Sequence, residues 1–228
     1  MTITNAKLMR VAGLCALLAG VVFLLPQFIH PEDEVASVTT TGWAVAHLVN
    51  MSMAILALIG VTGLYLRQVR ETGVLGLLGY LLFGTGFLLI AIVSFAEAVI
   101  LPKIADAVPG YVSDFLATLV DDPVKGDVGG LSLANGIAGI TYLLGGLVFG
   151  IALYRARIVA RWAALLLAVG GVTPLFVAVL PDSMLRTATF PTAIAMIGLG
   201  YSLWREKRIV IPEPTPSVSS SQLNAAGV

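Results

Sequence analysis

The sequence predicts an all-α integral membrane protein, built as one bundle of six transmembrane helices over residues 1–208. Three observations support this fold class. The 228 residues are 58% hydrophobic and only 11% charged, which is about half the charged share of a soluble domain. Six apolar stretches are each long enough to cross a hydrocarbon core, which takes about 20 helical residues. Lysine and arginine gather at one end of these stretches.

The six spans are expected near residues 9–29, 43–66, 75–101, 131–154, 161–180 and 187–204. Lys7 and Arg10 precede the first apolar run, as they would in a secretory signal peptide. No small-x-small cleavage pattern follows, so we interpret this run as a retained first span. The last span has Pro191 in its opening turn, where the N–H that proline lacks would be unpaired in any case.

The basic residues give the orientation. Of the 13 lysines and arginines, only Lys103, Lys125 and Arg186 fall on one side of this layout. The positive-inside rule therefore makes the other side cytoplasmic and places both termini there, in a bacterial-type inner membrane. The net charge is zero, so nothing in the composition indicates a nucleic-acid partner.

Two short patterns suggest internal repetition. A Leu-Pro pair ends each outward-running span, at Pro26, Pro102 and Pro181, and each inward-running span ends with "GLYLR", "GIALYR" or "GYSLWR". Three tandem helical hairpins would produce both patterns. The alternative is that interfacial aromatics and inside arginines recur in any membrane protein.

Two segments outside the spans have a distinct character. Within the outer loop 102–130, apolar residues of "GYVSDFLATLV" recur at helical spacing, which predicts a short amphipathic helix that lies on the membrane or caps the bundle. The tail 209–228 is rich in proline and serine, so we expect it to be disordered.

Three polar side chains are expected at the same depth, one turn below the outer surface. His47 follows Trp43 by four residues, Glu97 precedes Leu101 by four, and Asn135 lies four residues into the fourth span. Polar groups inside a bilayer are costly and therefore indicate function. Four further residues share a face with these three or lie above them: Asn50, Ser94, Tyr142 and His30.

This arrangement suggests acid–base chemistry. Beside His47, a charged Glu97 could orient the imidazole, and without that partner it would stay protonated and act as an acid. We assign Glu97 and His47 to catalysis, and the other five residues to substrate binding. The alternative is structural: the third span is long enough for Glu97 to reach the headgroups, and His47 and Asn135 could hold helices together.

We predict neither a metal nor a cofactor. His30, His47 and Glu97, with Asp33 or Glu34, could in principle ligate a metal, but no closely spaced ligand motif supports such a site. The single cysteine, Cys15, cannot form a disulfide within the chain. No phosphate-binding loop or nucleophile elbow occurs in the sequence.

The stretches "RVAGLCALLAGVVFLLPQFIHP", "WAVAHLVN" and "FAEAVILP" resemble segments of small polytopic bacterial membrane proteins of unassigned function. This resemblance covers most of residues 9–204 and implies no activity. In size and in its intramembrane acid the chain is more loosely similar to the small integral-membrane terpene cyclases. That likeness would imply that Glu97 protonates an alkene or epoxide of a prenylated substrate.

Three classes of function therefore remain. The first is a membrane-embedded enzyme that acts by acid–base chemistry on a lipid or isoprenoid, with membrane lipids and an apolar or amphipathic small molecule as its partners. The second is a non-catalytic accessory or assembly protein that associates with a second copy or with another membrane protein. The third is a small permease, which would need a polar route across the bundle.

Overall fold

The computed structural model describes residues 4–119, 123–177 and 189–205. Within these ranges the chain is helical and contains no strand. The helices are α1 (Asn5–Leu24), α2 (Pro26–Ile29), α3 (Val35–Val38), α4 (Thr41–Arg67), α5 (Val69–Phe95), a π-helical turn η1 (Ala96–Ile100), α6 (Leu101–Ile104), α7 (Pro109–Leu119), α8 (Gly129–Ala156), α9 (Arg161–Val177) and α10 (Phe190–Arg205).

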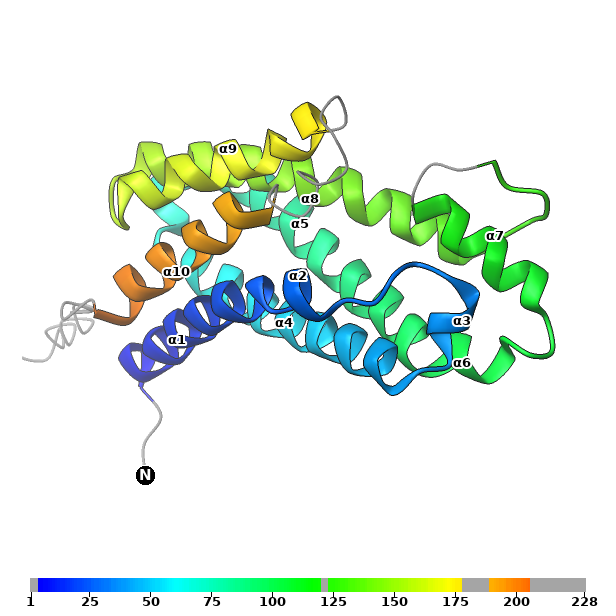
Figure 1. Ribbon diagram of the computed structural model, residues 1–228. Coiled ribbons are helices and arrows are strands. Elements are labelled where there is room, and N and C mark those ends of the chain that lie inside the picture. The colour runs from blue at the N-terminus through cyan, green and yellow to red at the C-terminus, as the bar shows by residue number, and fades with distance from the viewer. Residues whose placement is uncertain (1–3, 120–122, 178–188, 206–228) are drawn as a thin grey trace, which may run out of the picture.

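The long helices pack as a ring in chain order. Helix α1 packs on α4, α4 on α5, α5 on α8, α8 on α9 and α9 on α10, and α10 closes the ring against α1. Figure 1 shows the short helices α3, α6 and α7 gathered at one end of this bundle. The first residues of α1 and the last residues of α10 lie at the opposite end (Figure 1).

Four helical segments are long and apolar enough to cross a membrane, in agreement with the first four predicted spans. They are Asn5–Ile29, Thr41–Arg67, Val69–Ile104 and Gly129–Ala156. The chain is therefore an all-helical protein compatible with membrane insertion. The described parts of the last two predicted spans are helices of 17 and 16 residues, and residues 178–188, which separate them, lie outside the described residues. Six crossings and three repeated hairpins stay predictions.

The connection predicted before residue 75 is partly helical. Only Gln68 separates α4 from α5, and α5 is kinked at Gly73, where the backbone is not helical. Buried Gln68 accepts a hydrogen bond at its main-chain oxygen from the Thr72 hydroxyl, at 2.8 Å. The chain then turns at Gly73, whose φ of 56° lies in the left-handed region that glycine tolerates. The uninterrupted part of the third span therefore begins after Gly73, close to the predicted residue 75.

Glycines let the helices of the ring approach closely. A Cβ added at Gly79 in α5 would lie 2.5 Å from the main-chain nitrogen of Phe149 in α8, and one added at Gly86 would lie 2.8 Å from that of Tyr142. Small residues at such crossings are typical of membrane bundles, where tight packing replaces the hydrophobic effect as the main attraction between helices.

The amphipathic helix predicted in the outer loop is present as α7. Its apolar face buries Val112, Phe115 and Leu116. These side chains belong to a cluster of buried residues at the α7 end of the bundle, which also contains Val38, Trp43, Val93, Leu101, Ala105 and Val128. Helix α7 therefore covers this end of the bundle, which we call the pocket end. The tail predicted to be disordered, 209–228, lies outside the described residues.

Candidate functional site

The site is built around a buried pair of ionisable side chains from α4 and η1. His47 Nδ1 lies 2.8 Å from Glu97 Oε2, and the two residues are only 4% and 5% exposed. The contact has the distance of an ion pair, although its angles fall short of a hydrogen bond, and His47 Nε2 has no hydrogen-bond partner. A carboxylate at this distance favours a proton on Nδ1, which leaves Nε2 of a neutral ring unprotonated.

Glu97 lies in the π-helical turn Ala96–Ile100, and Pro102 explains why the helix widens there. Proline has no N–H to donate to the carbonyl of Ala98 four residues earlier, and its ring crowds that carbonyl. The N–H of Leu101 instead reaches back five residues to the Ala96 carbonyl, which is the π-helical pattern. Single π-helical turns of this kind are frequent at functional sites.

This turn leaves the main-chain carbonyl of Glu97 without a partner in its own helix. The N–H four residues on, that of Leu101, is bonded to Ala96, and the residue five positions on is Pro102, which has none. Trp43 supplies the missing donor: its indole Nε1 donates to the Glu97 oxygen over 2.9 Å, in the fully buried interior. This hydrogen bond holds the backbone of Glu97 against α4.

His30 follows α2 and brings a second imidazole to the pair. Its Nδ1 lies 2.7 Å from the Pro31 carbonyl. Because a carbonyl only accepts, Nδ1 carries the proton and the neutral ring presents an unprotonated Nε2. The ring of His30 stands edge-on to that of His47, with ring centroids 4.9 Å apart. The centroid of the Trp43 ring lies 4.3 Å from that of the His47 ring. The rings of His30, Trp43 and His47 therefore pack against one another.

Asn50 and Ser94 continue the polar surface one turn further in. Asn50 Nδ2 donates to Ser94 Oγ over 2.9 Å, which ties α4 to α5 below the ion pair. Ser94 accepts in this bond, so its own hydroxyl proton remains to be donated elsewhere. The carbonyl oxygen of Asn50 is likewise not used by this contact. Both residues can therefore offer hydrogen bonds to a bound molecule.

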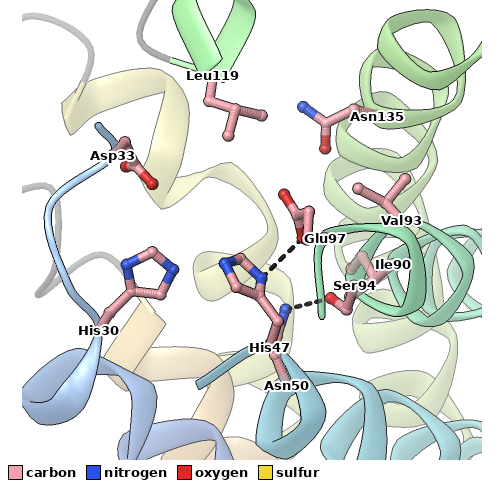
Figure 2. Close-up of a pocket in the computed structure, with 10 residues that line it drawn as sticks. All are labelled: His30, Asp33, His47, Asn50, Ile90, Val93, Ser94, Glu97, Leu119 and Asn135. Carbon is pink, nitrogen blue, oxygen red and sulfur yellow. Dashed lines mark hydrogen bonds and ion pairs between the residues drawn. The ribbon is translucent and has the colours of Figure 1, made fainter. Parts of the chain in front are cut away.

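These residues line one cavity of about 230 Å³ at the pocket end of the bundle. Figure 2 shows Asn135 on the far side of Glu97 from His30, and Leu119 of α7 above the cavity. The ten residues that line it are His30, Asp33, His47, Asn50, Ile90, Val93, Ser94, Glu97, Leu119 and Asn135.

The structure brings six of the seven predicted site residues to this cavity and leaves one outside it. Tyr142 does not line the cavity and packs instead among aromatic rings, with centroids 5.4 Å from Phe83 and 5.6 Å from Phe87. It shares a helix face with Asn135, but seven residues along a helix carry it about 10 Å further into the bundle. The prediction took account of the face and neglected the depth.

Two polar contributors were not among the predicted site residues. Asp33 was considered only as a metal ligand, and it lines the cavity from an exposed position. Trp43 was used only to place the depth of His47, whereas it is fully buried and donates a hydrogen bond to Glu97. A proline five residues after an intramembrane acid was the signal that could have indicated a freed carbonyl and a donor to meet it.

Across the described ranges 4–119, 123–177 and 189–205, no group of three histidine, cysteine or acidic side chains is arranged to hold a metal ion. No family model, curated protein or solved structure matches the chain. The site must therefore be interpreted from its own geometry.

Proposed function

We propose that the protein is a membrane-embedded enzyme that acts by acid–base chemistry on a lipid or isoprenoid amphiphile. The observation that carries this proposal is the buried His47–Glu97 pair at 2.8 Å, which borders a cavity of about 230 Å³. A paired carboxylate and imidazole out of bulk water is a common proton-handling unit. Keeping such a pair buried costs free energy, and catalysis is a reason to keep it.

The geometry supports different roles for His47 and Glu97 in proton transfer. His47 Nε2 is free to take a proton from an O–H or N–H group of the substrate, and Glu97 stabilises the imidazolium that forms. The same proton can then be returned to a leaving or rearranged group. Asn50, Ser94 and Asn135 lie around the cavity, where they would orient the substrate.

The size of the cavity supports an amphiphilic substrate whose polar head reacts. Sites that enclose a whole drug-sized ligand usually measure about 300–1,000 Å³, and this one is smaller. Its apolar walls are Ile90, Val93 and Leu119. We infer that the head enters the cavity from the outer leaflet, while the chain of the substrate remains among lipids and the outer parts of the helices.

The bundle core favours an enzyme over a permease. Between the cavity and the opposite end, the main core cluster consists of alanine, leucine, valine, methionine and phenylalanine side chains. Buried polar side chains at that end, among the described residues, include Gln68 and Thr72 at the α4–α5 junction. Among the described residues, a permeating polar solute would meet mostly apolar side chains in this core, with Thr192 of α10 as a further buried polar group.

The function is tested by comparing lipid extracts from cells that have or lack the gene, complemented with variants. Wild-type protein should restore a lipid species that changes when the gene is removed. Glu97→Gln should lower its formation by about 100-fold or more, because the general base His47 then loses the carboxylate that stabilises its imidazolium form. Glu71→Gln, the same change at an exposed position in the first turn of α5, should have no effect.

A double variant separates an enzyme from an accessory protein. Breaking the buried pair in one variant leaves an uncompensated charge, whereas replacing both members with apolar residues is often neutral for stability. His47→Leu combined with Glu97→Leu should therefore fold and remain inactive. A double variant that retains full biological function would show that the pair is structural and would favour the accessory role.

A further inference from the structure

The cavity around His47 and Glu97 offers hydrogen-bond acceptors and negative charge. Asp33 at its mouth and Glu97 inside it are both carboxylates, and none of its ten described lining residues is a lysine or an arginine. Carboxylates that are ionised can only accept hydrogen bonds. A bound group that carries N–H donors and a positive charge would satisfy both, whereas an anionic group would be repelled.

The two histidines add further acceptors directed at the same space. His30 donates through Nδ1 to the Pro31 carbonyl, so its Nε2 is an acceptor. His47 is 4% exposed, and its Nε2 has no hydrogen-bond partner. Figure 2 shows the His47 nitrogen that does not face Glu97 turned toward the side where His30 and Asp33 lie. A buried polar atom left without a partner is costly, and a ligand donor would remove that cost.

We propose that this cavity binds the ammonium head of an amphiphile, with N–H groups donated to His47 Nε2 and to the carboxylate of Asp33. This inference rests on the proposed function, because it names the substrate class of the same site. It also argues against direct recognition of prenyl diphosphates, since side chains that bind a diphosphate directly are arginine and lysine. No such basic side chain lines the described cavity.

The cavity suits a small head. Its volume of about 230 Å³ is about eight times the roughly 30 Å³ that one water molecule occupies in the liquid. An amine with a short polar stem fits this space. The walls formed by Ile90, Val93 and Leu119 would contact the first carbons of the attached chain.

Binding is measured through Trp43 fluorescence. The chain has three tryptophans, and a protein that carries both Trp162→Phe and Trp204→Phe retains only Trp43. The centroid of the Trp43 ring lies 4.3 Å from that of the His47 ring. The purified full-length protein in neutral maltoside micelles is titrated with dodecylammonium, dodecyl phosphate and dodecanol. Ethylammonium is added in a fourth titration, to tell a lipid-borne ammonium from a free amine.

We expect saturable binding of dodecylammonium that is at least about tenfold tighter than that of dodecyl phosphate. Asp33→Asn should weaken ammonium binding by about two- to fivefold, the range for an exposed charge pair. The matched control is Glu34→Gln, which removes an equal charge next to Asp33 from an exposed residue outside the cavity lining. This control should bind as the parent protein does.

Three results would overturn the proposal. Dodecyl phosphate could bind as tightly as dodecylammonium, or Asp33→Asn could behave as Glu34→Gln does. Ethylammonium could also match dodecylammonium, which would show a site for free amines. None of these results depends on turnover, so they test binding independently of the proposed enzyme activity. If ammonium binds as expected but no lipid species depends on Glu97, the site binds a ligand without catalysing a reaction.

Discussion

The indole of Trp43 donates a hydrogen bond of 2.9 Å to the main-chain oxygen of Glu97, a residue 54 positions later in the chain. This bond satisfies a carbonyl that the π-helical turn and Pro102 leave without a helical partner. It therefore links the start of α4 to a main-chain carbonyl of η1 that has no donor in its own helix. The position of the Glu97 carboxylate beside His47 depends on this link.

Trp43→Phe tests how much this bond stabilises the fold. The variant keeps an aromatic ring in the buried cluster but leaves the Glu97 oxygen unpaired, which costs about 1–3 kcal/mol. The thermal midpoint in detergent should fall by several degrees. Trp204→Phe, at a tryptophan that is 46% exposed, provides the control and should leave the midpoint unchanged. Equal midpoints for the two variants would show that the indole bond is dispensable.

Pro102→Ala tests whether the proline maintains the π-helical turn. Alanine restores an N–H at position 102, so the segment can return to regular α-helix, and the N–H of Leu101 can then bond to the Glu97 carbonyl in place of Trp43. Residues after the turn would rotate by about 100°, the angle per residue in an α-helix.

We expect this variant to fold, to lose most of the proposed lipid-modifying activity and to shift the fluorescence of Trp43 to longer wavelength in the single-tryptophan background. Pro109→Ala, at the exposed first residue of α7, should leave both measurements unchanged. An active Pro102→Ala protein with an unshifted emission spectrum would mean that the turn is held by tertiary packing without the proline.

Two glycines test the closure of the ring at the α5–α8 contact. A Cβ at Gly79 would lie 2.5 Å from the main-chain nitrogen of Phe149, whereas one at Gly139 in α8 would meet nothing within 4 Å. Gly79→Ala should therefore destabilise the bundle by about 1–3 kcal/mol. Gly139→Ala should be neutral or stabilise it by up to about 1 kcal/mol, since alanine favours the helix.

The two variants carry the same substitution, so a thermal unfolding series in one detergent compares them directly. Destabilisation by Gly139→Ala equal to that of Gly79→Ala would contradict the packing of α5 against α8. The result does not depend on the proposed chemistry, because neither glycine lines the cavity.

The sequence alone determined that the chain is helical and that its long helices are apolar, because hydropathy and helical period are properties of each segment by itself. It also gave the depth of His47, Glu97 and Asn135 along their own helices, since helical rise is constant. These two quantities were enough to bring six of the seven predicted residues to one cavity.

Only the tertiary structure decided which side chains meet. Helical period gives the face of a residue relative to its own axis, but the rotation of neighbouring helices depends on packing at residues such as Gly79 and Gly86. The His47–Glu97 contact, the donor from Trp43 and the arrival of Asp33 from the loop before α3 all depend on that packing. Tyr142 shows the converse: it was assigned to the right face but lies too deep in the bundle to reach the site.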